Sequence, residues 1–316
     1  MNIAVIIPTY NRSELLRRTL EGLSRQTELA IIQEVIVVSD GSSDATREAA
    51  EQFSGRLPVR VLEQGRLGVS RARNYGIREA ESDVVLFLDD DVVPGPHLVA
   101  EHAKFHREMR GLEAVLMGYV TWHPDMQVTP FMRWYGEFGG LYGFSLLKEN
   151  QEVDPRYLYT CNVSFKTEFI RANDGFTESL SVLEDHELAY RLAKKGMTFF
   201  FSRAAIGYHY QSFTFEKACE RLRRYSVGLD AFLSTEAGRK MAQKRGRVGV
   251  RALEALARFV ARLASPLKTL VDSNVPMPNS MYRLFYWYYG TDLSFWGRVS
   301  APVVANAPRD SARAKD

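Results

Sequence analysis

Three consecutive aspartates, Asp89, Asp90 and Asp91, follow the apolar run 84–88 and are the residues of this sequence best suited to chemistry. Three adjacent carboxylates repel one another unless a positive charge lies among them. A divalent cation such as Mn²⁺ or Mg²⁺ would supply that charge, because it takes one or two carboxylates and fills its remaining positions with phosphate oxygens and water. The alternative is that the aspartates only end a strand or cap the next helix. The triplet therefore predicts a metal site that also holds a diphosphate.

The segments around the triplet alternate between short apolar runs and helical patterns. Four runs are aliphatic without polar alternation, as expected of strands buried on both faces of a parallel sheet: 3–8, 34–39, 59–63 and 84–88. An apolar stripe along 15–23 predicts a first helix capped by Asn11, and further helices begin near Asp44 and within 68–82. Three strand–helix–strand units in a row predict an α/β domain with a doubly wound, mostly parallel sheet flanked by helices.

Polar residues follow these strands at the edge where such sheets bind ligands, outside the carboxyl ends of the strands. Pro8, Thr9 and Tyr10 end the first run, Asp40 ends the second, and the aspartate triplet ends the fourth. Later in the chain the pattern predicts strands at 115–122, 159–166 and 198–210, and a helix at 184–195 that ends at Gly196. We expect one ligand site at this edge of the sheet.

Two large classes of nucleotide-binding protein are disfavoured. A P-loop needs the pattern G-x-x-x-x-G-K-[ST], and the sequence contains no Gly-Lys pair. The dinucleotide pattern G-x-G-x-x-G is absent after the first strand, where Pro8-Thr9-Tyr10 stands instead. A diphosphate ligand therefore has to be held by a different kind of site.

Five segments in this order resemble the family 2 glycosyltransferases of the GT-A fold: IIPTYNR at 6–12, VVSDGSSD at 37–44, GVSRARNYGI at 68–77, FLDDDVVP at 87–94 and VLEDHELAYRL at 182–192. The resemblance covers residues 1 to about 212. It implies a catalytic domain whose nucleotide-binding half spans about 1–95 and whose acceptor half spans about 96–212. The expected donor is a nucleoside-diphosphate sugar, with a UDP-sugar favoured.

The resemblance also implies roles for individual residues. Tyr10 matches a residue that stacks on the nucleotide base, Asp40 matches an acid that accepts a hydrogen bond from the base, and Asp89 lies nearer the ribose or the sugar. The full donor-binding set is Pro8, Thr9, Tyr10, Asp40, Arg73, Asp89 and Asp90. The implied ligands of Mn²⁺ or Mg²⁺ are Asp91, Asp89 and His209.

An inverting transfer needs a general base that takes the proton of an acceptor hydroxyl. The resemblance places this base at Asp185 and gives Glu184 an assisting or acceptor-positioning role. The residue pattern also has a structural explanation, because Ser181-x-x-Glu184 fits a capping box and an acid is favourable in the first turn of a helix. A non-catalytic sugar-nucleotide-binding or scaffold protein and a nucleotidyltransferase of related fold remain alternatives. Hydrolysis is disfavoured, since a hydrolase does not need nucleotide-binding motifs.

The C-terminal segment 213–316 lies outside these motifs and predicts a basic, aromatic-rich helical extension. Residues 213–270 carry 13 Lys or Arg against 5 Asp or Glu, 252–270 shows a helical apolar stripe, and 282–289 is mostly Tyr, Trp and Phe. Such a segment suits the surface of an anionic membrane and an acceptor carried on a lipid. The alternative is packing on the catalytic domain or on a second copy of the chain, with Phe285, Trp287 and Tyr289 as core or interface residues.

Composition indicates the compartment. The 316 residues contain no apolar run of transmembrane length, the N-terminal segment lacks the features of a signal peptide, and there are only two cysteines. We therefore expect a cytoplasmic protein, peripheral on the cytoplasmic face if it binds a membrane. The expected partners are the sugar donor and a carbohydrate or lipid-linked acceptor in surface polysaccharide or glycolipid synthesis, not nucleic acid.

Overall fold

The strands of the described residues form a mixed sheet whose order is β3-β2-β1-β4-β7-β6-β8-β5. The computed structural model describes residues 1–149, 151–243 and 260–290. The strand bounds are β1 (Ile3–Thr9), β2 (Ile32–Asp40), β3 (Val59–Gln64), β4 (Val84–Leu88), β5 (Val92–Pro94), β6 (Ala114–Trp122), β7 (Asn162–Lys166) and β8 (Thr198–His209). The predicted mostly parallel α/β sheet is confirmed.

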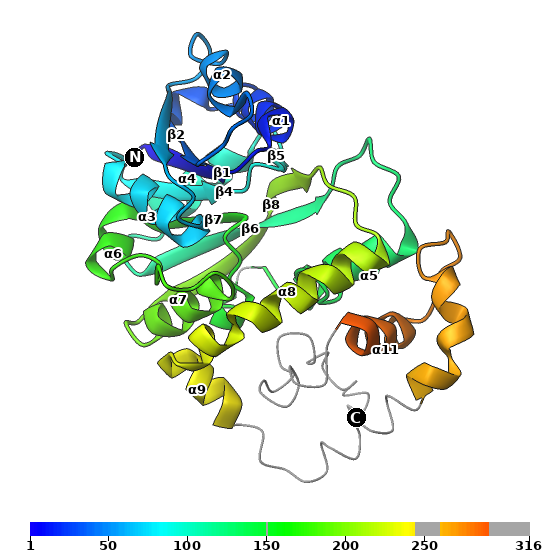
Figure 1. Ribbon diagram of the computed structural model, residues 1–316. Helices are drawn as coiled ribbons and strands as arrows, with labels where there is room; N and C mark the ends of the chain where they lie inside the picture. Colours follow the sequence, from blue (N-terminus) through cyan, green and yellow to red (C-terminus); the bar gives the residue numbers. More distant parts are fainter. Residues whose placement is uncertain (150, 244–259, 291–316) are drawn as a thin grey trace, which may run out of the picture. The chain divides into compact units, whose positions relative to one another are not determined.

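The first four strands, β3, β2, β1 and β4, are parallel neighbours, which brings their carboxyl ends to one edge (Figure 1). The second half is mixed: β7 runs antiparallel to β4 and β6, while β6 and β8 are parallel. All five residues of β4 are fully buried, as their continuous apolar sequence predicts. The aspartate triplet therefore leaves the sheet at its centre.

Helices cover the sheet between these strands: α1 (Ser13–Leu23), α2 (Thr46–Glu51), α3 (Val69–Glu79), α4 (Leu98–Glu108), α6 (Thr167–Ala172) and α7 (Glu184–Ala193). Glycine permits two of the closest approaches. A Cβ on Gly76 would lie 2.5 Å from Ile6 Cγ2, so α3 packs directly on β1. A Cβ on Gly22 would lie 2.8 Å from Pro94 Cδ, so α1 packs directly on β5.

The predicted cap of the first helix is wrong. Asn11 has a positive φ of 50°, and its side chain turns away to accept a hydrogen bond from the backbone N–H of Ser43 at 2.7 Å. The helix begins instead at Ser13, whose N–H donates to Asp44 Oδ2 at 3.0 Å. Asp44 thus caps α1 from a distant loop, and its other oxygen accepts a hydrogen bond from the hydroxyl of Thr46, the first residue of α2. This exchange holds the loop after β1 against the loop after β2.

The chain divides into two compact units. The sheet unit comprises Met1–Gln127, Lys148–Ser212 and Val227–Gly238. The aromatic unit comprises Val128–Leu147, Phe213–Ser226 and the described residues from Arg239 onward. Its helices include α5 (Pro130–Glu137), the first part of α8 (Phe215–Leu233) and α11 (Asn279–Gly290). The domain boundary at 212 remains a proposal.

Aromatic side chains form the core of the aromatic unit. Trp134 stacks on Tyr282 with ring centroids 5.7 Å apart, and Tyr135 packs edge-on against Tyr286 at 5.6 Å. Phe285 is fully buried, and Tyr282 and Tyr286 are each 2% exposed. In this segment the packing alternative therefore holds for Phe285, whereas Trp287 and Tyr289 are half-buried.

The predicted helix at 252–270 lies partly outside the described residues. Its described part changes at Ser265–Leu270 to a 3₁₀ helix that contains Pro266, since proline interrupts an α-helix. Val260 and Leu263, expected on an apolar packing stripe, are 43% and 67% exposed. Within the part of the chain that the structure describes, no helix is both long enough and apolar enough to cross a bilayer.

Candidate active site

Asp90 is held below the surface at the end of β4. Thr9 Oγ1 donates to Asp90 Oδ2 at 2.8 Å, and Thr19 Oγ1 donates to the Asp90 carbonyl at 2.9 Å. Asp90 is only 4% exposed. Burial raises the pKa of Asp90 to about 7, and the charge of Asp91 adds to this, while Arg12 and Thr9 oppose it. The central acid of the triplet thus faces α1 and the interior.

Arg12 supplies positive charge to the triplet. Its Nη1 lies 2.8 Å from Asp90 Oδ1 and 3.0 Å from Asp91 Oδ2. The guanidinium is 35% exposed, whereas the two carboxylates are each 5% exposed. Sequence reasoning gave Arg12 no role, although it lies within the segment IIPTYNR. The available signal was a cation at the carboxyl end of β1, next to the strand that carries three acids.

Asp91 lies beside His209, because β5 pairs with the end of β8 and places Val92 opposite His209. His209 Nε2 is 3.5 Å from Asp91 Oδ1, and Tyr210 N–H donates to the Asp91 carbonyl at 2.7 Å. Two donor atoms at this separation fit one cation with bonds of about 2.1 Å. Among the described residues, no group of three or more acidic, His or Cys side chains is arranged to hold a metal. A cation here would need phosphate oxygens or water as further ligands.

Arg73 joins the first and last acids of the candidate site. Its Nη1 donates to Glu184 Oε1 at 2.8 Å, and its Nη2 lies 3.7 Å from Asp89 Oδ1. The Arg73 side chain is 6% exposed, and its guanidinium lies 5.3 Å from the ring centre of Phe176. Arg73 is therefore committed to two carboxylates and is not the solvated charge that an amphipathic helix often carries.

The helix α7 starts abruptly at the acids. Leu183 has a left-handed φ of 58° and makes no side-chain cap, so the predicted capping box from Ser181 to Glu184 is wrong. The positive φ directs the chain sharply into the helix, and Glu184 and Asp185 occupy its first turn. An acid is favourable there because the helix N-terminus carries partial positive charge. Asp185 thus lies in the first turn of α7, where the sequence also offered a structural explanation for an acid.

Asp185 is paired with the next residue. Asp185 Oδ1 accepts hydrogen bonds from the backbone N–H of His186 at 2.9 Å and from His186 Nδ1 at 3.0 Å. Burial raises the pKa of Asp185, but the hydrogen bonds and charge of His186, together with the charge of Arg73, outweigh burial and leave this pKa below its ordinary value. The carboxylate is thus ionised at neutral pH.

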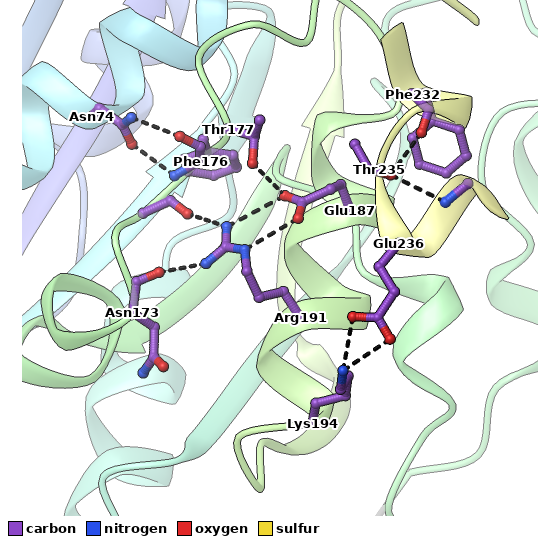
Figure 2. Close-up of polar contacts among 12 residues, drawn as sticks. Asn74, Asn173, Phe176, Thr177, Glu187, Arg191, Lys194, Phe232, Thr235 and Glu236 are labelled. Carbon is purple, nitrogen blue, oxygen red and sulfur yellow. Dashed lines mark hydrogen bonds and ion pairs between the residues drawn. The ribbon is translucent and has the colours of Figure 1, made fainter. Parts of the chain in front are cut away.

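A polar network fixes α7 in the sheet unit (Figure 2). Arg191 on α7 donates to the carbonyls of Asn173 and Gly175, the latter at 2.6 Å. Glu187, one turn earlier, accepts from Arg191 Nε at 3.1 Å and from Thr177 Oγ1 at 2.8 Å. The loop before α7 is therefore held to the helix that it precedes.

The same loop is bound to α3. The Asn74 side chain donates to the carbonyl of Phe176 and accepts from its N–H, both at 2.8 Å. Ser70 Oγ donates to the Leu180 carbonyl at 3.0 Å. At the far end of α7, Lys194 pairs with Glu236 at 2.8 Å (Figure 2). The loop that leads into α7 is thus held against α3 at Phe176 and at Leu180.

Asp40 and Tyr10 lie at a third part of the sheet edge. Asp40 Oδ1 accepts from Leu67 N–H at 2.7 Å, and Asp40 Oδ2 accepts from Gly68 N–H at 3.0 Å. The Arg66 guanidinium lies 4.4 Å from the ring centre of Tyr10. Asp40 therefore fixes the loop that carries Arg66 over the expected base-stacking ring.

The predicted site residues fall into connected groups along this edge. Arg12 pairs with Asp90 and Asp91, which in turn contact Thr9 and His209. Arg73 pairs with Asp89 and with Glu184, the residue before Asp185. Tyr10 and Asp40 form the third group with the loop at 65–68. Pro8 is part of β1 and is half-buried. Sequence reasoning missed Arg12 and His186, which each bind an acid that it did identify.

Comparisons with known proteins agree with this fold and these motifs. The family model "Glycosyl transferase family 2" matches residues 4–130, and the model "Glycosyl transferase family group 2" matches residues 84–301. Validoxylamine A glucosyltransferase of Streptomyces hygroscopicus is 33% identical over 239 residues, covering 65% of this chain and 54% of that protein. The chain thus spans about half the length of this relative.

Poly(ribitol-phosphate) beta-N-acetylglucosaminyltransferase TarS of Staphylococcus aureus is 28% identical over 194 residues, which cover 58% of this chain and 31% of TarS. The structure of TarS residues 1–349 with UDP-GlcNAc superposes with a TM-score of 0.54 at 18% identity, covering 92% of this chain and 90% of that one. A mannosyltransferase from Pyrobaculum calidifontis, solved with GDP-Man and Mn²⁺, gives 0.56 at 18% identity, covering 90% and 84%. These likenesses establish the GT-A fold, and together with the family models they mean that the chain belongs to the family 2 glycosyltransferases.

Proposed function

We propose that this protein is an inverting glycosyltransferase that moves a sugar from a nucleoside-diphosphate sugar to an acceptor hydroxyl. The observation that carries the proposal is the pairing of Arg73 with Asp89 at 3.7 Å and with Glu184 at 2.8 Å. This pairing connects the acids expected beside the donor to the helix that carries the expected base. Transfer needs both sets of groups within reach of one sugar.

Three groups of residues would bind the donor. Tyr10, with Pro8 and Thr9, lies where the base would stack, and Asp40 holds the neighbouring loop through Leu67 and Gly68. Asp89 pairs with Arg73, which also binds Glu184 at the start of α7. Asp91 and His209, with Asp89, would hold Mn²⁺ or Mg²⁺, which when bound neutralises charge on the diphosphate as it leaves.

The proposed chemistry is a single displacement. The acceptor oxygen attacks the anomeric carbon and forms the new bond, while the bond from that carbon to the diphosphate oxygen breaks and its electron pair leaves with the diphosphate. Asp185 takes the proton of the acceptor hydroxyl. Its lowered pKa keeps it ionised at neutral pH, which is the form that a base requires. Glu184, already bound to Arg73, would orient α7 and the acceptor.

A UDP-sugar is the favoured donor. The TarS structure holds UDP-GlcNAc, and the Pyrobaculum enzyme, at a similar TM-score, holds GDP-Man. The acceptor would be a carbohydrate or a lipid-linked carbohydrate, in surface polysaccharide or glycolipid synthesis. TarS is named as an N-acetylglucosaminyltransferase whose acceptor is poly(ribitol-phosphate), a polymer.

The test is to identify the products. The protein is incubated with UDP-glucose, UDP-GlcNAc or GDP-mannose and Mn²⁺, with and without a panel of sugar and lipid-linked acceptors, and the released phosphate species are separated. Transfer or donor hydrolysis releases a nucleoside diphosphate. A parallel reaction supplies UTP or GTP with a sugar 1-phosphate, from which a nucleotidyltransferase would release pyrophosphate, whereas a scaffold would bind nucleotide without turnover in either reaction. Either of these two outcomes would refute the proposed function.

Binding to an anionic membrane stays a prediction. Exposed Leu263 and Leu267 lie near Arg262 and Lys268 in the aromatic unit, a combination that suits a lipid surface. Co-sedimentation with vesicles that contain phosphatidylserine, for the full chain and for a Leu263→Ser, Leu267→Ser variant, measures this. Equal sedimentation of both proteins would exclude this surface.

A further inference from the structure

We propose that His186 is a positioning residue for the base: its ring fixes the Asp185 carboxylate so that Oδ1 is held and Oδ2 remains for the acceptor hydroxyl. This inference rests on the proposed function and extends it to a residue that touches neither donor nor acceptor.

The two carboxylate oxygens of Asp185 differ in their hydrogen bonds. Both donors of His186, its backbone N–H at 2.9 Å and its ring Nδ1 at 3.0 Å, reach the same oxygen, Asp185 Oδ1. In the described part of the chain, Asp185 Oδ2 accepts no hydrogen bond. The two oxygens are therefore unequal, because one is occupied and the other can receive a proton.

The second step concerns the ring itself. The His186 side chain is 12% exposed, and its Nε2 is buried without a hydrogen-bond partner among the described residues. Asp185 is thus the polar partner of this ring, and Nδ1 carries the donated proton whether or not Nε2 is also protonated. A buried ring with one hydrogen bond cannot rotate freely, since rotation would leave a second polar atom unsatisfied.

The third step concerns the surroundings of the pair. Tyr159, from the segment before β7, lies edge-on to the His186 ring with centroids 6.3 Å apart. Arg73 on α3 and the adjacent Glu184 are the charged groups whose fields act on the pair. The network of Arg191 and Asn74 holds the helix beneath it. Because α7 is held in place, the His186 ring is held too, and its hydrogen bond restricts rotation of the Asp185 carboxylate.

The positioning role also predicts a change in pH dependence. Burial raises the pKa of Asp185, and among the effects that lower it the hydrogen bond from His186 is the largest. Removing this bond should raise the pKa of the base and move the acid limb of the kcat profile to higher pH. A residue that merely fills space would lower stability without moving this limb.

The test compares three substitutions of one residue. His186→Asn keeps a donor near the position of Nδ1, His186→Gln moves the donor one bond outward, and His186→Phe keeps the ring shape without a donor. Turnover is measured from pH 3.5 to 9, a range that includes the acid limb expected of a carboxylate with a lowered pKa, with Mn²⁺ and whichever of UDP-glucose, UDP-GlcNAc and GDP-mannose the parent protein uses best, with water as the acceptor. Calorimetric binding of the matching nucleoside diphosphate with Mn²⁺ provides a readout independent of turnover.

We expect His186→Phe and His186→Gln to lose about 10- to 100-fold in kcat, as misplacement of a catalytic group does, with donor KM and nucleotide binding unchanged and the acid limb raised. His186→Asn should retain most of the turnover. Equal losses in the Asn and Phe variants, or an unmoved acid limb in the Phe variant, would overturn the positioning role. The proposed function would still stand in that case if Asp185→Asn were inactive, and would itself fail if the unsubstituted protein did not turn over.

Discussion

Arg73 Nη1 lies 2.8 Å from Glu184 Oε1, and this ion pair joins α3 to the first turn of α7. Both side chains are largely buried, and a second nitrogen of the same guanidinium lies 3.7 Å from Asp89. One cation therefore balances an acid from each side of the candidate site. Its loss would affect the fold and the proposed catalysis together.

Removing Glu184 should destabilise the protein. Glu184→Ala removes the nearer carboxylate from the buried Arg73 and leaves the more distant Asp89, and breaking one partner of a buried pair costs about 3–5 kcal/mol. Glu184→Gln keeps an acceptor for Arg73 and should cost less. Urea unfolding at pH 7 measures both free energies. An alanine variant within about 0.5 kcal/mol of the parent protein would show that the pair contributes little.

Arg12, which directly precedes α1, should matter more than a surface arginine within that helix. Arg12→Gln leaves Asp90 and Asp91 close together without their shared cation, and we expect the free energy of unfolding without metal to fall by about 2 kcal/mol. Arg17, which pairs with the exposed Glu14, is the matched control, and Arg17→Gln should leave the free energy of unfolding almost unchanged, because water screens an exposed ion pair. Equal effects of the two substitutions would contradict the role assigned to Arg12.

Substitutions of the proposed base and of a proposed metal ligand should differ in their effects on nucleotide binding and turnover. Asp185→Asn removes the proposed base and should lower kcat by about 10²- to 10⁴-fold while nucleotide binding is kept. Asp91→Asn removes a proposed metal ligand and should lower turnover and also weaken nucleotide binding. The weaker binding should appear as a smaller thermal shift with UDP and Mn²⁺. Asp125→Asn, at an exposed carboxylate, serves as the control. Normal turnover by the Asp185 variant would remove the base assignment.

Two buried histidines should make stability depend on pH. His102 Nδ1 and His106 Nε2 both contact Ser164 Oγ, at 2.7 and 2.8 Å. Burial lowers the pKa of His102 to about 4 and that of His106 to about 3, from ordinary values of 6.5. Because the unfolded chain binds these protons more readily, the stability is complete above about pH 6.5 and falls as pH decreases toward those values.

The corresponding experiment follows urea unfolding from pH 7.5 to 4.5. His106→Gln removes one of the two groups and should reduce the slope of stability against pH between 6.5 and 4.5, whatever its effect at pH 7.5. His97→Gln, a substitution of an exposed histidine, provides the comparison. Identical slopes for the parent and His106→Gln would show that this histidine is not held neutral in the folded protein.

Strands and strand ends could be predicted from the sequence because their signals are local. The runs that became β1 and β4 are continuously apolar, as are residues 35–38 of β2, whereas β3 carries Arg60 and Glu63 and is only half-buried. A polar residue at each carboxyl end marks where the strand stops. Parallel order then brings Thr9, Asp40 and Asp89 to one edge. The fold and the general position of the site follow from these signals.

Partners that lie far apart in the chain could not be predicted in this way. Asn11 looked like a helix cap, but its positive φ sends the side chain to Ser43, and Asp44 caps α1 instead. Arg12 lies 78 residues before Asp90, and Arg73 lies 111 residues before Glu184. Such pairs depend on tertiary packing, so their residues carry no local pattern.

The Arg66 guanidinium lies 4.4 Å from the ring centre of Tyr10, so it covers one face of the ring on which a base is expected to stack. A base that stacked on the same face would release a long side chain whose regained rotamer freedom offsets part of the ordering of the nucleotide, by up to about 2 kcal/mol. The backbone of that loop would stay in place meanwhile, since Asp40 holds Leu67 and Gly68. Exchange of one flat cation for one flat base would thus proceed without rebuilding the loop.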